Sequence, residues 1–133
     1  KYKMISSEIL AKQPDTFLEN IKKPENNEEL NKWVNDTSNY NTWHSSGLTT
    51  LLYIVGESNS KLSKEYIYGG FSKITEDMGI EIFDILIQAN PDLELKNYYG
   101  DTFKAKFLEN EKGEGLRKNN TKFLNHIKET MKW

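Results

Sequence analysis

The chain has 133 residues, of which 36% are hydrophobic and 29% are charged, and its formal net charge at pH 7 is −2. This length suits one domain with a core of its own, and the modest hydrophobic fraction favours an elongated, thin-cored fold. The nearly balanced charge argues against a nucleic-acid or anionic-membrane partner. The absence of cysteine excludes disulfide bonds and cysteine-based metal sites.

The sequence gives two indications of where the protein acts. No apolar run approaches the roughly 20 residues of a membrane span. Near the amino end, Glu8 and Lys12 interrupt any apolar region, so a signal peptide is not expected there. We therefore expect an intracellular, cytoplasmic protein. The start at Lys1, without methionine, fits a fragment or a processed chain.

The first part of the chain predicts short helices. Residues 5–12 form an amphipathic helix that ends before Pro14, and Asp15 is expected to cap a second helix over residues 16–22. A third helix is predicted over residues 28–35, with an acidic start that complements the helix dipole. Its apolar face consists of Leu30, Trp33 and Val34.

A polar, turn-rich segment separates these helices from the rest. It covers residues 36–46, and Gly47 then precedes an apolar helix over residues 48–55. The last helix is predicted over residues 121–132 with Thr121 as its cap. Its expected buried face consists of Phe123, Leu124, Ile127 and Met131.

Residues 79–102 carry the strongest local pattern. An apolar helix ends at Asn90, because the proline that follows disfavours a helical conformation there. Residues 93–96 alternate apolar and polar side chains, which predicts a short extended segment. Residues 97–100 predict a tight turn, after which Asp101 or Thr102 caps the next helix.

This unit of helix, finger and helix resembles part of an ankyrin repeat, whose pattern is EIVxLLL followed by GADVNxxDxxGxTPLH. Residues 81–87 (EIFDILI) match the helix, residues 92–95 (DLEL) the start of the finger, and residues 100–102 (GDT) the opening of the next repeat. Residues 47–49 (GLT) precede that opening by 53 positions, and the apolar positions between the two copies agree under the same shift. Because an ankyrin repeat has about 33 residues, this spacing implies an insertion of about 20.

The resemblance implies an all-α, ankyrin-like solenoid of paired antiparallel helices with short finger loops. Residues 1–133 would form one domain with repeats at about 15–46, 47–99 and 100–133, and the long insertion would cover residues 57–77. The first helices would begin at residues 16, 49 and 102, where a threonine recurs.

The sequence departs from the family pattern in its first helices. No repeat has a complete TPLH, because Phe17, Thr50 and Phe103 stand where proline is expected. Lys104 stands where leucine is expected, which indicates a degenerate terminal repeat. The long connection and the asparagine- and lysine-rich composition are similar to ankyrin proteins of giant viruses, which would place the protein in a host cytoplasm.

Ankyrin arrays recruit proteins through their fingers and first helices, so the resemblance implies a non-enzymatic protein–protein interaction module. Aromatic side chains favour the finger side as the contact surface, because tryptophan and tyrosine are enriched at binding hot spots. The predicted partner-binding residues are Tyr40, Trp43, His44, Tyr53, Lys96, Tyr98 and Tyr99.

Three alternatives stay open. The chain could be the substrate-recruiting adaptor part of a larger regulatory protein such as a ubiquitin ligase, or a structural component that associates with itself. It could also be a small enzyme with a pocket at the insertion, formed by His44, Glu65, Tyr66 and Tyr68. We expect no catalytic, cofactor or metal site, since neither His44 nor His126 has an evident set of carboxylate partners and no phosphate-binding or nucleophile motif is present.

Overall fold

The computed structural model describes residues 4–36, 47–58, 74–97, 99–112 and 120–133. Within these ranges every regular element is a helix and no strand occurs, which confirms the all-α prediction. The elements are α1 (Ser7–Lys12), α2 (Pro14–Ile21), the 3-10 helix η1 (Pro24–Asn26), α3 (Asn27–Val34), α4 (Gly47–Ser58), α5 (Glu76–Gln88), α6 (Phe103–Lys112) and α8 (Thr121–Met131). None of the helices in the described ranges combines the length and apolarity needed to cross a membrane.

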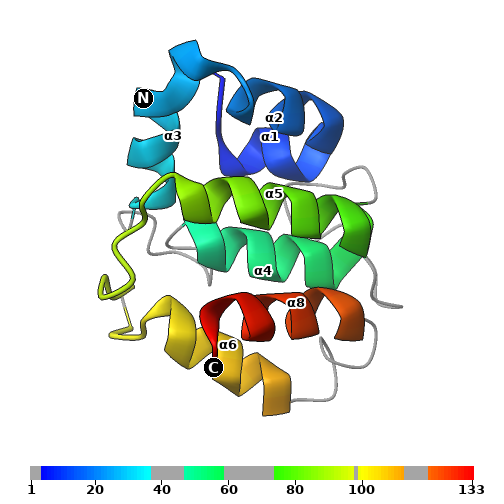
Figure 1. Ribbon diagram of the computed structural model, residues 1–133, viewed down its shortest axis with the longest axis vertical. Helices are drawn as coiled ribbons and strands as arrows, with labels where there is room; N and C mark the ends of the chain where they lie inside the picture. The colour runs from blue at the N-terminus through cyan, green and yellow to red at the C-terminus, as the bar shows by residue number, and fades with distance from the viewer. Residues whose placement is uncertain (1–3, 37–46, 59–73, 98, 113–119) are drawn as a thin grey trace.

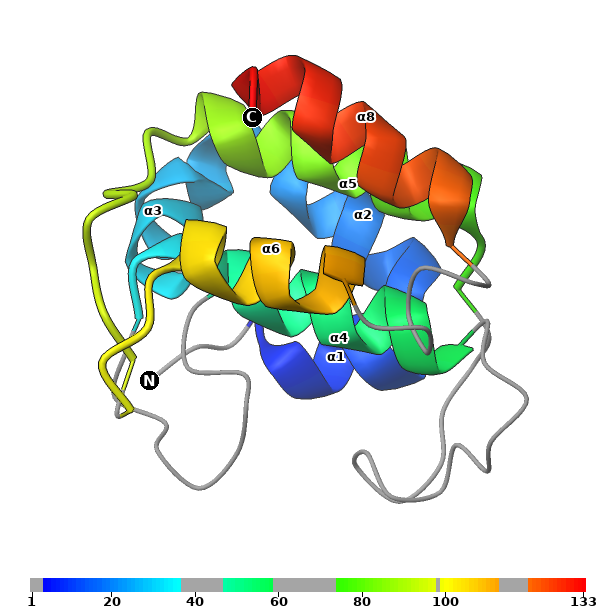
Figure 2. The ribbon, with the colours of Figure 1, turned by 90° about the horizontal axis from the view of Figure 1, so that it is seen from below.

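The helices lie in two rows. One row consists of α1, α4 and α6, and the other consists of α2, α5 and α8 (Figures 1 and 2). Within the rows, α4 packs against α1 and α6, and α5 packs against α8. The rows are joined where α1 meets α2 and where α4 meets α5. α3 lies at one side of the two rows, where it contacts α4.

α4 is the centre of the core. Between residues 47 and 56, Tyr53 is half-buried and every other residue is buried. This burial follows from packing on three sides, by α1, α5 and α6. Uniformly apolar helices are found in such interior positions. Tyr53 is therefore the least buried residue of this stretch of α4, and it lies near Lys106 of α6.

The positions related by the 53-residue shift have matching burial. Leu30, Trp33 and Val34 of α3 are all buried. Their counterparts Phe83 and Leu86 of α5 are fully buried, and Ile87 is half-buried. The helices themselves are not placed equivalently, because α3 lies outside the row that contains α5 (Figure 2).

Gly47 is required where α4 meets α3. A Cβ atom at this position would lie 2.8 Å from both the Trp33 ring and the Cα atom of Val34. Contacts this short are sterically forbidden, so any larger residue would separate the two helices. On its other side, the Trp33 ring lies edge-on to Phe17, with 5.2 Å between the ring centroids. α4 can therefore begin close against α3 only because residue 47 has no side chain.

Several predicted helix boundaries need correction. Gln13, not Asp15, is the N-cap of α2, and Asp15 lies in the first turn because Pro14 is already the first helical residue. Asn120, not Thr121, is the N-cap of α8. Thr102 does cap α6, since its Oγ1 atom accepts a 3.2 Å hydrogen bond from the amide of Ala105. Of the predicted buried face of α8, Phe123, Leu124 and Ile127 are buried, and Met131 is half-buried.

The finger also differs from the prediction. Residues 93–94 form a turn in place of an extended segment, and the amide of Leu95 donates to the carbonyl of Asp92 at 3.3 Å. The carboxylate of Asp92 accepts from the amide of Glu94, which stabilises the turn locally. The expectation for Asn90 is confirmed, because its φ of 61° lies in the left-handed region.

The order of the first helices differs from the predicted register. That register aligns residues 16–21 with the first residues of α4 and α6. In the structure it is α1 that lies in the row of α4 and α6, while α2 lies in the row of α5 and α8 (Figure 2). The recurrent threonine at residue 16 does not mark an equivalent position in space. Of the predicted insertion, residues 59–73 lie outside the described ranges, and its last residues Glu76 and Asp77 belong to α5.

Candidate partner-binding surface

The base of the finger is fixed by side chains of α3. The Nδ2 atom of Asn31 donates to the carbonyl of Ala89 at 2.9 Å, and the Oδ1 atom of Asn35 accepts from the amide of Asp92 at 2.7 Å. These two bonds satisfy backbone groups just beyond the end of α5, where no helical partner remains. The finger therefore leaves α5 in a defined direction.

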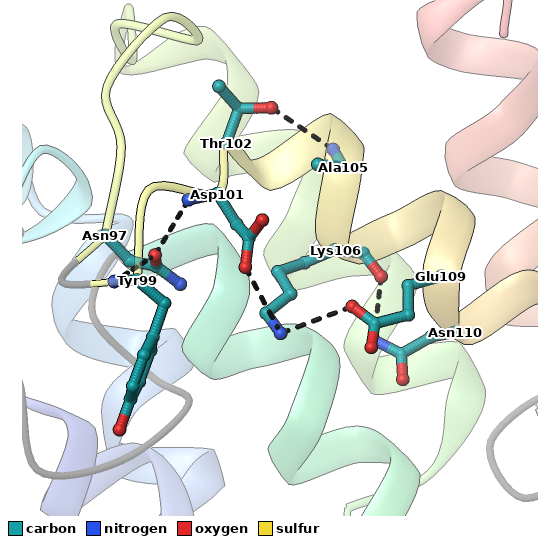
Figure 3. Close-up of polar contacts among 8 residues, drawn as sticks. All are labelled: Asn97, Tyr99, Asp101, Thr102, Ala105, Lys106, Glu109 and Asn110. Carbon is teal, nitrogen blue, oxygen red and sulfur yellow. Dashed lines mark hydrogen bonds and ion pairs between the residues drawn. The ribbon is translucent and has the colours of Figure 1, made fainter.

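The tip of the finger is a turn built on Asn97. Its Oδ1 atom accepts hydrogen bonds from the amides of Tyr99 and Asp101, each at 2.9 Å (Figure 3). The backbone amide of Asn97 donates to the carbonyl of Asp101 at 2.9 Å, and Gly100 supplies the left-handed conformation with φ of 86°. The Tyr99 side chain is 64% exposed on this hydrogen-bonded turn. A tyrosine presented in this way loses little conformational entropy when it is covered by a partner.

Lys106 connects the finger to α6. Its Nζ atom lies 3.6 Å from Oδ2 of Asp101 and 3.3 Å from Oε1 of Glu109 (Figure 3). The Lys106 side chain is only 16% exposed. Burial acts to lower the pKa of its ammonium group, but Tyr53, Glu109 and Asp101 outweigh burial and raise that pKa above its ordinary value of 10.5. Lys106 therefore stays charged and holds the finger against the row of α4 and α6.

Three of the predicted partner-binding residues lie in the described ranges. Tyr53 is on α4 beside Lys106, while Lys96 and Tyr99 are exposed on the finger. The structure thus places one predicted residue at the helix row and two on the finger. Tyr40, Trp43, His44 and Tyr98 lie outside the described ranges.

The sequence did not single out the residues that organise this surface. They are Asn97, Asp101, Lys106 and Glu109. Two local signals could have indicated them: an asparagine three residues before a glycine favours a side-chain-bonded turn, and Lys106 with Glu109 has the spacing of an ion pair on a helix. The contact of Lys106 with Asp101 and Tyr53 depends on packing and had no sequence signal.

The described residues offer little for catalysis or for a metal. His126 has a carboxylate partner, since its Nε2 atom lies 2.7 Å from Oδ1 of Asp84. No group of three metal-ligating side chains occurs within the ranges that the structure describes. The residues of the enzyme alternative, His44, Glu65, Tyr66 and Tyr68, lie outside those ranges.

A separate hollow of about 540 Å³ lies between α2, α3 and the end of α5. Ile21, Leu30 and Ile85 contribute apolar walls. Ala89 and polar side chains line the rest, and one of the polar residues, Lys22, forms a 2.9 Å ion pair with Glu81. The complete lining is Ile21, Lys22, Asn27, Leu30, Ile85, Gln88, Ala89 and Asn90.

Comparisons with models of known families, with curated proteins and with solved structures gave no match for this chain.

Proposed function

We propose that this chain is a non-enzymatic protein–protein interaction module with an ankyrin-like stack of helix pairs. The arrangement in two rows supports this proposal: α1, α4 and α6 would be the first helices of successive repeats, and α2, α5 and α8 would be the second helices. A finger that leaves α5 and leads into α6 fits the same architecture. In this reading α1 and α2 belong to the first repeat, which therefore begins before residue 15.

The partner would bind the surface formed by the finger and the exposed side of the first helices. The observation that carries this proposal is Tyr99, which is 64% exposed at the tip of a turn that Asn97 fixes with two hydrogen bonds. Exposed tyrosines on rigid supports are frequent binding hot spots. Tyr53 and Lys96 would extend the same surface along the helix row and the finger.

The test is a binding selection with three immobilised baits: the parent, Tyr99→Ala and the control Asn125→Ala. Asn125 is exposed on α8, in the other row of helices. A displayed library of protein fragments provides the candidates, and each enriched binder is measured against all three baits by calorimetry. We expect Tyr99→Ala to weaken binding about thirtyfold, by about 2 kcal/mol, and Asn125→Ala to leave it unchanged.

Circular dichroism must show the same helix content for all three baits. Binders that respond to Asn125→Ala and not to Tyr99→Ala would overturn the surface assignment. A selection that enriches no binder of the parent would overturn the proposed function.

A further inference from the structure

The hollow between α2, α3 and the end of α5 has the size of a binding site. Its volume of about 540 Å³ lies within the range of about 300–1,000 Å³ that is typical of ligand pockets. Its most buried lining residues are Ile21 and Leu30, each only 3% exposed, and Ile85 beside them is half-buried. An aliphatic group that entered the hollow would therefore leave water for contact with aliphatic side chains.

The three walls of the hollow are fixed to one another. Lys22, at the end of α2, forms its 2.9 Å ion pair with Glu81 of α5. Asn31 of α3 donates to the carbonyl of Ala89 just beyond α5, and Figure 1 shows α3 beside this end of α5. The short helix η1 contacts both α2 and α3. The hollow is therefore formed before a ligand enters it, so that little binding free energy is lost in ordering the site.

Three carboxamide side chains make up most of the polar lining: Asn27, Gln88 and Asn90, all exposed. Within the described residues, none of these three side chains has a hydrogen-bond partner. Their neighbours Asn31 and Asn35 differ, because each of them binds a backbone group beyond the end of α5. A carboxamide carries a donor and an acceptor side by side, as a peptide group does. The lining therefore offers to a ligand the chemistry with which α3 already binds backbone.

The hollow favours a neutral ligand. Lys22 is the only charged residue among the described lining residues, and its ammonium is paired with Glu81. A further charge placed against the aliphatic walls would lose its hydration without gaining a partner. The fitting ligand has an aliphatic group for the hollow and amide groups for the carboxamides. An extended peptide segment has this composition, and no helix of its own occupies its backbone donors and acceptors.

We propose that the hollow binds an extended segment of a partner protein. One leucine-like side chain of that segment lies against Ile21, Leu30 and Ile85, and its peptide groups form hydrogen bonds with the surrounding carboxamides. In recognition of extended peptides, main-chain hydrogen bonds provide affinity and side-chain pockets provide specificity. The inference is independent of the finger-side binding, because Tyr99 does not line the hollow.

Titration of the whole chain with N-acetyl-leucine-N-methylamide tests the inference, because this probe carries one aliphatic side chain between two peptide groups. The side-chain amides of Asn27, Gln88 and Asn90 give signals of their own in proton–nitrogen NMR correlation spectra. We expect these signals to shift and to saturate with a Kd of about 1 mM, as for a small ligand of ordinary efficiency. Unchanged signals at probe concentrations up to about 30 mM would overturn the proposal.

Two further probes separate the aliphatic contribution from the peptide contribution. N-acetyl-glycine-N-methylamide keeps the peptide groups without the side chain, and isoamyl alcohol keeps the aliphatic group without a peptide group. Each should bind about tenfold more weakly than the leucine probe. Equal binding of isoamyl alcohol would overturn the recognition of a peptide, and equal binding of the glycine probe would overturn the role of the aliphatic walls.

A double variant, Asn27→Ala with Gln88→Ala, removes two of the three carboxamides. Both residues are exposed, so the fold is expected to persist, and the leucine probe should bind about tenfold more weakly. Asn125→Ala is the matched control, since it removes an exposed carboxamide on α8, and it should bind the probe like the parent. Tyr99→Ala on the finger should also bind like the parent. Unchanged binding by the double variant, or equal weakening by Asn125→Ala, would overturn the proposed site.

Discussion

The helix α5 is held on its two sides by different chemistry. On the side of α3, carboxamide side chains such as Asn31 bind backbone groups at the end of α5. On the side of α8, polar side-chain contacts accompany the buried Phe123. The Lys122 ammonium lies 2.5 Å from the Asp77 carboxylate, and His126 lies 2.7 Å from Asp84.

One carboxylate illustrates the second kind of junction. Oε1 of Glu76, in the first turn of α5, accepts a 2.7 Å hydrogen bond from the amide of Phe123 in the first turn of α8. Asn120, the N-cap of α8, makes no capping hydrogen bond with its own side chain. A neighbouring helix therefore provides the cap that the sequence of α8 lacks. The stability contributed by the contacts between α3 and α5 should therefore depend little on salt concentration and on charge. The stability contributed by the contacts between α5 and α8 should depend on both.

The largest effect is expected where α3 packs on α2 and α4. Trp33→Ala removes a ring that packs on Phe17 and covers Gly47, so it should lower the free energy of unfolding by about 3–5 kcal/mol. Urea denaturation measures the change. Trp133→Ala is the matched control, because Trp133 is half-buried at the end of the stack and should cost clearly less. Equal losses for the two variants would contradict the buried position of Trp33 between Phe17 and Gly47.

A smaller effect is expected from Gly47→Ala. The added methyl group would meet the Trp33 ring and the backbone of Val34 at 2.8 Å, and overpacking of this kind costs about 1–3 kcal/mol. Thermal unfolding measures it. Gly100→Ala has no neighbour within 4 Å but requires φ of 86°, so it isolates backbone strain from steric overlap. A Gly47→Ala variant as stable as the parent would show that α4 can move away from α3 without loss.

Glu76→Gln tests the charged junction. The substitution keeps an acceptor for the amide of Phe123 but removes its charge, so we expect a loss of about 0.5–1 kcal/mol that salt diminishes. Urea denaturation at low and high salt gives both values. Asn31→Ala is the counterpart at the first junction, and its cost should be the same at both salt concentrations. The reverse salt dependence would refute the contrast between the junctions.

Lys106→Gln should cause the smallest loss of stability, and this loss should depend on pH. Because the pKa of Lys106 is raised in the folded chain, its contribution is fully present below pH 10.5 and is lost as pH rises through the higher folded value. At pH 7 the variant should lose about 0.5 kcal/mol. This difference from the parent should shrink in denaturation curves recorded above pH 10.5.

Local sequence patterns predicted the positions of the helices well, but they predicted which helices pack together less well. The apolar spacing of Leu30, Trp33 and Val34 was sufficient to predict a buried face, because one side of a helix is a property of its own sequence. Caps were predicted within two residues, and the errors at Asp15 and Thr121 arose where a proline or a neighbouring helix took over the expected role. The row to which α1 belongs depends on contacts with α4, and no motif within residues 5–12 encodes it.

The surface was predictable in part for the same reason. Tyr99 follows from a turn signal that is local, and its exposure is observed. The Lys106 contacts join the finger, α4 and α6, so they require the folded arrangement. The predicted site as a whole stays a prediction, since Tyr40, Trp43, His44 and Tyr98 lie outside the described ranges.

Gln13 limits the sequence changes that the connection between α1 and α2 can accept. It is at once the C-cap of α1 and the N-cap of α2: its amide donates to the carbonyl of Ile9 at 2.7 Å, and its carbonyl accepts from the amide of Phe17 at 2.9 Å. Because a single residue connects the two helices, one added or lost residue would turn α1 by about 100° relative to α2. Leu10 would then leave the core. Insertions and deletions should therefore be tolerated far less at this joint than substitutions.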